Sequence, residues 1–361
     1  MRILYIIKDN PKISVGHAAD RARNFLTQLK LQGHEVECLF PDESLRRRNI
    51  LEKIVGLTQS YHQRSAGQKF TDHISQVIFK NKFDIIIAEE LSPAGFALKA
   101  LNPKKVPLVY VAHNVESDLY KQIVQSHVIE KWRINNLIKF EKNVIQQADI
   151  IFSFSEEDRN RLVQISGGKK IHLTRAGVEL LKTHPAGLSL KDKVLFVGAL
   201  DYFPNIQALQ WYSNHVHPLV KIKYQLLVAG RNPGSRVKEI CQMNGFTLIS
   251  SPAKMQPILE QGILEIVPLL SGSGTRGKIL EAASFNIPVL STTLGAAGLG
   301  FIHQKNIVLA DQPNDFANEL ENLLNQPERA RSISINAKEY VKYFYYEEVV
   351  KDFMRELKSL K

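Results

Sequence analysis

Residues 268–292, PLLSGSGTRGKILEAASFNIPVLST, gather the residue types that bind a phosphate group. An apolar run ends in the segment SGSGTRG, whose small side chains let backbone amides approach an anion closely. A helical pattern follows, and an anion at its start meets unpaired N–H groups and the positive end of the helix dipole. Arg276 and Lys278 add full charges, and Glu281 is placed to accept hydrogen bonds from two ribose hydroxyls. The alternative is an ordinary strand–loop–helix turn with a solvated Glu281.

Two series of apolar runs, each alternating with helical patterns, must position these residues. The first series includes MRILYII, FDIIIAEE and PLVYVAH, and the second includes KVLFVGA, YQLLVAG and ILEIVPL. Runs that are apolar on both faces predict a parallel sheet covered by helices on both sides. We therefore expect an α/β protein with two Rossmann-like, doubly wound domains, whose ligands bind at the carboxyl ends of the strands.

The expected domain boundary lies in a polar stretch that separates the two series. We place the N-terminal domain at residues 1–182 and the C-terminal domain at residues 183–337. The remaining tail shows helical patterns with no strand after them. We expect the helix at residues 338–361 to pack back on the N-terminal domain.

The composition is that of a globular protein. Of the 361 residues, 44% are hydrophobic and 23% are charged, and no apolar run is long enough to predict a membrane-spanning helix. The first residues, MRILYIIKDN, lack the cleavage site of a signal peptide. Cys38 and Cys241 lie far apart, which argues against a disulfide framework, so we expect a cytoplasmic protein. The net charge of +11 predicts anionic partners such as phosphates, acidic lipids or nucleic acid, or else serves only solubility.

Several segments, in order along the chain, resemble the retaining glycosyltransferases of family four, which have the GT-B fold. PLLSGSGTRGKILEAASFNIPVLSTTLGAAGL resembles the branch whose donor segment reads GSGTR-x-K-ILEA. FVGALDYFPNIQALQWY resembles the first strand and helix of the family's C-terminal domain, and AHNVESDLY resembles its histidine-bearing strand end. The likeness covers nearly the whole chain. It implies two domains facing across a cleft, with the acceptor side in the first domain and the nucleotide-sugar donor in the second.

The resemblance gives roles to individual residues. It implies that Glu281 binds the nucleotide ribose and that the backbone of Gly274, Thr275 and Arg276 lies beside the diphosphate and the donor sugar. It also places His113, at the end of PLVYVAH, beside the donor sugar near the reacting carbon. His113 is therefore the candidate catalytic residue.

The chain departs from the family pattern at several of these positions. Gly16, in the first loop, would let the backbone approach the diphosphate, although a Gly-Gly pair is frequent there. The family often has a pair of glutamates in the donor segment, and the first of them falls on Ser273, which leaves the identity of the sugar open. A common Arg and Lys after the first strand of the C-terminal domain are replaced by Ala199 and Pro204.

The diphosphate must therefore draw its cations from elsewhere in the chain. The candidates are Arg276, Lys278 and Arg231, which follows the run YQLLVAG. Tyr202 and Asn205, near the first strand of the C-terminal domain, receive no role beyond shaping a turn.

We expect the reaction to need no metal and no cofactor. No Asp-x-Asp element occurs in the sequence, so no carboxylate pair is evident for a divalent ion. Positive side chains and helix dipoles would then neutralise the leaving diphosphate. The expected co-substrate is a sugar linked to UDP or GDP, and the expected product belongs to cell-surface polysaccharide or glycoconjugate biosynthesis.

Residues 44–57, SLRRRNILEKIVGL, combine a run of arginines with an apolar stripe. A basic helix of this kind lies on anionic membranes, which would suit a lipid-linked acceptor and peripheral contact with the inner face of the membrane. Alternatively, the stripe packs on its own domain. The expected acceptor is a glycan or lipid-linked hydroxyl group.

Two rival functions stay open at this point. A sugar-nucleotide epimerase has the same two-domain architecture, but it needs acid and base residues around the sugar, and the sequence indicates only His113. A non-enzymatic binder of nucleic acid or membrane would suit the positive charge. No helix-turn-helix, zinc or RNA-stacking signature favours nucleic acid as a partner.

Overall fold

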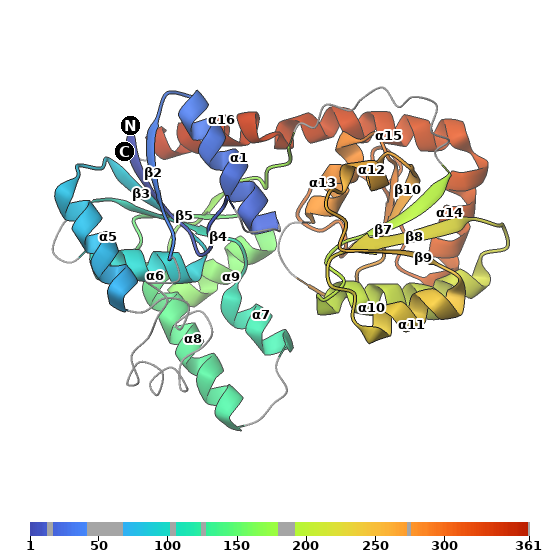
Figure 1. Ribbon diagram of the computed structural model, residues 1–361, viewed down its shortest axis with the longest axis horizontal. Coiled ribbons are helices and arrows are strands. Elements are labelled where there is room, and N and C mark those ends of the chain that lie inside the picture. The colour runs from blue at the N-terminus through green and yellow to red at the C-terminus, as the bar shows by residue number, and fades with distance from the viewer. Residues whose placement is uncertain are drawn as a thin grey trace. The chain divides into compact units, whose positions relative to one another are not determined.

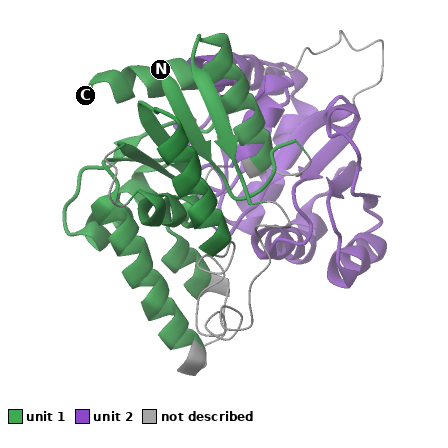
Figure 2. Cartoon of the chain, turned by 60° about the vertical axis from the view of Figure 1, so that its left-hand side comes forward, with its two compact units in different colours: residues 1–177, 273–275, 349–361 green, residues 178–272, 276–348 purple. Residues whose placement is uncertain are grey.

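The computed structural model describes residues 1–12, 17–41, 68–101, 106–123, 128–179, 192–272 and 276–359. Contacts divide the chain into two compact units (Figure 2). Unit 1 includes Met1–Gly177 and Val349–Lys361, and unit 2 includes Val178–Gly272 and Arg276–Glu348. The chain therefore returns to unit 1 at its last helix. The basic segment at residues 44–57 lies outside the described residues.

Unit 1 is built on a parallel sheet of six strands in the order β2-β1-β3-β4-β5-β6 (Figure 1). The central strands β3 and β4 are buried along their whole length, as expected for strands covered on both faces. The strands are β1 Arg2–Ile6, β2 Glu35–Leu39, β3 Ile85–Glu89, β4 Leu108–Ala112, β5 Ile150–Ser153 and β6 His172–Leu173. The helices are α1 His17–Leu31, α5 Gln68–Lys80, α6 Leu91–Ala100, α7 Glu116–Ile123, α8 Val128–Gln147, α9 Glu156–Ser166 and α16 Tyr346–Ser359.

Helices cover both faces of the unit 1 sheet. Helices α5, α6 and α8 share one apolar core with alternate residues of the strands. The opposite face carries an aromatic cluster, in which the ring of Phe353 on α16 lies 5.2 Å from Phe25 on α1 and 4.4 Å from Phe152 on β5. The last helix thus completes the layer that α1 begins.

Unit 2 repeats this plan with a second parallel sheet, in the order β12-β11-β10-β7-β8-β9 (Figure 1). Its strands are β7 Lys193–Val197, β8 Gln225–Gly230, β9 Thr247–Ser250, β10 Gly262–Val267, β11 Val289–Ser291 and β12 Val308–Leu309. Its helices are α10 Phe203–Trp211, α11 Ser235–Asn244, α12 Gln256–Leu259, α13 Gly277–Ser284, α14 Pro313–Asn325 and α15 Pro327–Val341, with short turns η1 Tyr212–Val216, η2 His217–Leu219 and η3 Lys342–Phe344. The predicted α/β architecture with two parallel sheets is confirmed.

Strands β7 and β8 come unusually close together where they end. The N–H of Gly198 donates to the carbonyl of Ala229 at 3.1 Å, and the N–H of Leu200 donates to that of Arg231 at 2.9 Å. A Cβ atom on Gly230 would lie 1.6 Å from the carbonyl oxygen of Gly198. The backbone after β7 can adopt this conformation only because residue 230 has no side chain.

We expect Gly230→Ala to lower the free energy of unfolding of unit 2 by about 1–3 kcal/mol or more, because two backbones must separate to admit the methyl group. Urea unfolding measures this change when it is followed by fluorescence in a Trp132→Phe background, where Trp211 of unit 2 is the remaining tryptophan. Gly234→Ala is the control, since a Cβ atom there meets nothing within 4 Å. The control should cost at most about 1 kcal/mol, because alanine begins a helix less well than glycine. Equal stability of the two variants would contradict the close approach.

Candidate functional site

Lys278 lies in the first turn of α13 and reaches the segment that follows β7. Its Nζ atom donates to Asn205 Oδ1 at 2.8 Å and lies 5.5 Å from the centre of the Phe196 ring. The Nδ2 atom of Asn205, in turn, donates to the carbonyl of Ala199 at 2.9 Å. Asn205, which sequence reasoning left as a turn residue, therefore holds the ammonium group in place.

Gly198 leaves the space that the ammonium group occupies. A Cβ atom on Gly198 would lie 2.8 Å from Lys278 Nζ and 2.9 Å from Asn205 Nδ2, and φ of Gly198 is +152°. The cations that the family carries after β7 are Ala199 and Pro204 in this chain. Lys278, which belongs to α13, supplies a positive charge to this same segment.

Two carboxyl groups accompany Lys278. Glu281 lies one turn further along α13, is partly exposed, and has its pKa raised to about 7 by burial, which Lys278 only partly offsets. Glu265 on β10 is fully buried, and neither of its carboxylate oxygens has a hydrogen-bond partner in the part of the chain that the structure describes. Burial raises the pKa of Glu265 well above its usual value and lowers that of Lys278 to about 8. Because its pKa stays near 8, Lys278 is mostly charged at neutral pH, and a bound anion would favour that charged form further.

The two predicted arginines have different surroundings. Arg276 precedes α13 and is buried, and its Nη2 atom donates to the carbonyl of Gly272 at 2.7 Å. The Arg276 guanidinium thus holds the carbonyl of Gly272, the last described residue before the glycine-rich loop. Arg231 follows β8, is about half exposed, and has its Nε atom 3.6 Å from Asp201 Oδ1. The structure therefore brings Lys278 and Glu281 together, while Arg231 pairs with a carboxylate.

The backbone part of the predicted site belongs to segments that the structure does not describe. Gly16, Ser273, Gly274 and Thr275 all lie outside the described residues, so their roles stay predictions. Among the residues that the structure does describe, no three His, Cys, Asp or Glu side chains gather as metal ligands would. In those same ranges, no helix has both the length and the apolar character needed to cross a bilayer.

His113 directly follows β4 in unit 1 and is held by its neighbours. Its Nε2 atom lies 3.0 Å from Glu89 Oε2, at the end of the adjacent strand β3. The ring packs edge-on against Phe154, with 5.2 Å between ring centres. Only 12% of the His113 side chain is exposed. The predicted catalytic histidine thus has a fixed ring at the carboxyl edge of the sheet.

Glu89 is the centre of a buried charge network that sequence reasoning missed. Its Oε1 atom accepts a hydrogen bond from the Tyr5 hydroxyl and lies 3.3 Å from Arg21 Nε. The Arg21 guanidinium lies over the rings of Phe25 and Phe154, at 4.8 and 4.5 Å from their centres. Burial alone would raise the pKa of Glu89, but Arg21 and His113 outweigh it and lower that pKa to about 2. Glu89 is therefore an anion that anchors one edge of the His113 ring.

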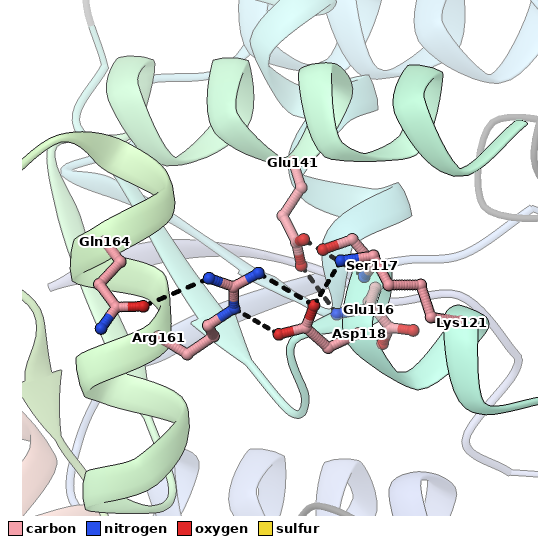
Figure 3. Close-up of polar contacts among 7 residues, drawn as sticks. All are labelled: Glu116, Ser117, Asp118, Lys121, Glu141, Arg161 and Gln164. Atoms are coloured by element: carbon pink, nitrogen blue, oxygen red, sulfur yellow. Dashed lines mark hydrogen bonds and ion pairs between the residues drawn. The ribbon is translucent and has the colours of Figure 1, made fainter. Parts of the chain in front are cut away.

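Figure 3 shows a further polar cluster in unit 1, where α7 begins. Glu141, on α8, accepts hydrogen bonds from the backbone N–H groups of Glu116 at 2.8 Å and Ser117 at 3.3 Å. It thereby satisfies two of the amides that a helix start leaves unpaired. Asp118 accepts two hydrogen bonds from Arg161, which ties α7 to α9.

A cavity of about 370 Å³ opens beside the Asp118–Arg161 pair. Its lining residues are Val115, Asp118, Glu157, Asp158, Asn160, Arg161 and Gln164. Carboxylates outnumber cations in this lining, so the cavity suits a hydroxyl-bearing ligand better than an anion. It lies beside the starts of α7 and α9, the helices that follow β4 and β5, near the sheet edge that carries His113.

Two family models match consecutive parts of the chain. The model described as Glycosyltransferase Family 4 matches residues 18–180, and the model described as Glycosyl transferases group 1 matches residues 191–326. The chain belongs to the glycosyltransferases. These matches agree with the family resemblance of the sequence, while the retaining mechanism and the branch of the donor segment stay predictions.

A curated relative matches part of this glycosyltransferase. An uncharacterised 44.6 kDa protein in the cps region of Klebsiella pneumoniae is 32% identical over 164 residues. This match spans 42% of each of the two chains.

Solved structures share the whole fold at low sequence identity. Sucrose-phosphate synthase of Thermosynechococcus elongatus is 17% identical with a TM-score of 0.77, and the match covers 100% of this chain and 99% of that one. HepE of Anabaena, in complex with UDP and glucose, is 15% identical with a TM-score of 0.71, covering 99% and 100%. A putative UDP-N-acetylglucosamine 2-epimerase of Listeria monocytogenes is 15% identical with a TM-score of 0.62, covering 99% and 96%. The GT-B fold is confirmed.

We expect Glu141→Gln to change the pH dependence of stability. Burial raises the pKa of Glu141 from its usual 4.5 to about 7, so the folded protein holds a proton that the unfolded chain releases. This contribution is greatest below the unfolded pKa and is lost as pH rises through the folded pKa. Between about pH 5 and pH 8 the free energy of unfolding of the variant should therefore gain up to about 3 kcal/mol relative to wild type.

Urea unfolding at a series of pH values measures this difference. Glu35→Gln, at an exposed carboxylate of the same unit, is the control. A stability difference between Glu141→Gln and wild type that stays constant with pH would contradict the buried, protonated Glu141.

Proposed function

We propose that the protein is a retaining glycosyltransferase that moves a sugar from a nucleoside-diphosphate sugar to a hydroxyl of a glycan or lipid-linked acceptor. The observation that carries the proposal is the Lys278 ammonium, held beside Gly198 in the first turn of α13 with Glu281 one turn away. A cation and unpaired helix amides at one point suit a diphosphate. A carboxylate one turn further suits the two hydroxyls of the attached ribose.

The proposed reaction takes place on one face of the donor sugar. The bond between the anomeric carbon and the phosphate oxygen breaks while the acceptor oxygen bonds to the same carbon. The acceptor proton goes to the departing phosphate, so the protein needs no general base, and because the acceptor itself attacks the anomeric carbon, the protein needs no nucleophile. Negative charge grows on the diphosphate, and Lys278 with the first amides of α13 stabilises it, which is where electrostatic catalysis contributes most. We expect no metal requirement.

We propose UDP or GDP as the nucleotide of the donor. The shared fold of HepE, which was solved with UDP and glucose, supports a uridine nucleotide. His113 would contact the donor sugar, and the polar cavity beside Asp118 and Arg161 would receive hydroxyl groups of the acceptor. The proposal includes peripheral membrane contact through residues 44–57, which lie outside the described residues.

A sugar-nucleotide epimerase is the second candidate, and one observation favours it. The structure places the carboxylates of Glu89 and Glu90 beside His113, and an epimerase needs acid and base groups around its sugar. The family matches favour transfer, because both matching models describe glycosyltransferases. Analysis of the products without an acceptor separates the two, since only an epimerase changes the sugar while it is still linked to the nucleotide.

We expect the purified protein to release UDP or GDP from one member of a panel of sugar nucleotides in the presence of an acceptor, with no loss of rate in EDTA. Glu281→Gln should lower kcat/KM for the donor by about 10–100-fold, because hydrogen bonds to a charged group are worth about 1.5–3 kcal/mol. Glu239→Gln, at an exposed carboxylate on α11, is the control and should keep the wild-type rate. Undiminished turnover in Glu281→Gln would contradict the ribose assignment, and loss of activity in EDTA would contradict metal independence.

A further inference from the structure

Glu90 has a backbone conformation that residues with side chains rarely adopt. Its φ and ψ are 70° and 163°, between the end of β3 and the start of α6. The conformation is held from both sides, because the Glu90 N–H donates to the Val111 carbonyl at 3.0 Å and the Ala94 N–H donates to the Glu90 carbonyl at 3.3 Å. The side chain does not cap α6. Such strain persists where the surrounding structure imposes it, and glycine would adopt the same angles without cost.

The strained backbone directs the Glu90 side chain toward His113. Glu90 Oε1 lies 3.9 Å from His113 Nδ1, which is too far for a direct hydrogen bond. The opposite ring nitrogen is already taken by Glu89, whose side chain is only 3% exposed, whereas that of Glu90 is 20% exposed. The buried Glu89 carboxylate thus holds one ring nitrogen of His113, and the more exposed Glu90 carboxylate faces the other ring nitrogen without bonding to it.

We propose that Glu90 and His113 Nδ1 together bind one hydroxyl group of a sugar substrate. A single oxygen atom can lie within hydrogen-bond distance of both groups across a 3.9 Å span. The assignment deepens the proposed function and rests on it. Glu90 is then a substrate-binding residue of the transfer reaction, and the strain at its backbone is retained because a side chain is needed there.

The charges around Glu90 and His113 favour a hydroxyl group over an anion. Lys8 acts on Glu90 as a nearby cation, but the carboxylates of Glu89, Glu116 and Glu90 itself outnumber it, so a phosphate or carboxylate beside Glu90 is disfavoured. A hydroxyl group can donate to a carboxylate and accept from or donate to an imidazole nitrogen. Burial raises the pKa of Glu90, and His113 only partly offsets this shift, so a hydroxyl group that donates to the carboxylate would stabilise its charged form.

The test compares Glu90→Gly and Glu90→Gln with wild type. We expect Glu90→Gly to raise Tm by about 2 °C, because glycine removes the backbone strain. We expect both variants to lower kcat/KM for transfer by about 10–100-fold, because a hydrogen bond to a charged group is lost. Gln304→Gly is the control for activity, since Gln304 also has a positive φ of 62° but belongs to unit 2, whereas Glu90 and His113 belong to unit 1.

The source of the hydroxyl is distinguished by two assays on Glu90→Gln. If it belongs to the donor sugar, hydrolysis of the sugar nucleotide without acceptor falls together with transfer. If it belongs to the acceptor, hydrolysis keeps its wild-type rate and only transfer falls. Both results support the assignment.

Transfer by Glu90→Gln within twofold of wild type would overturn the proposal, and so would a lower Tm in Glu90→Gly. Failure of the wild-type protein to use any sugar nucleotide would instead overturn the proposed function. The comparison of Tm needs no substrate, so the two failures are distinguishable.

Discussion

The partly buried Lys278 ammonium group is the charge on which the proposed donor site depends. Burying an ammonium group is costly unless other groups replace its water, and Asn205 accepts only one of its three N–H groups. The Phe196 ring supplies a further favourable contact. Gly198 is also required, because a Cβ atom at this position would lie only 2.8 Å from Lys278 Nζ and would displace the ammonium group. The close approach of β7 and β8 at Gly230 fixes the backbone of Gly198. The geometry of the sheet therefore determines where the Lys278 ammonium group can lie.

The buried charge of unit 1, Glu89, is compensated by its neighbours, unlike Lys278. Glu89 is matched by Arg21, Tyr5 and His113, and the match is strong enough to lower its pKa to about 2 despite burial. A charge that its surroundings compensate serves to position a neighbour, and here that neighbour is His113. Lys278 and Glu90 are compensated less completely, with pKa values shifted by burial toward the neutral forms. Groups of this second kind gain most from a ligand, which is why we assign them to the substrates.

The sequence predicted the architecture because alternation of apolar runs and helical patterns depends on local residue order. It also predicted that Lys278 and Glu281 act together, since they lie one turn apart on the same helix. It did not predict the partners of either group. Asn205 and Gly198 meet Lys278 only through the fold, and Arg21 is far from Glu89 along the chain. The one local signal for the missed network was the carboxylate pair that ends FDIIIAEE, where an otherwise apolar strand finishes in two charges.

Titration calorimetry of UDP and GDP across a range of pH tests most directly whether the Lys278 ammonium holds the diphosphate. Burial lowers the pKa of Lys278 to about 8, so wild-type affinity for the nucleotide that binds should fall about tenfold between roughly pH 8 and pH 9.5 as the charge is lost. Lys278→Arg keeps its charge throughout and should show no such fall, whereas Lys278→Met should bind at least about tenfold more weakly at pH 7. Wild-type affinity in Lys278→Met at pH 7, or the same loss at high pH in Lys278→Arg, would contradict the account.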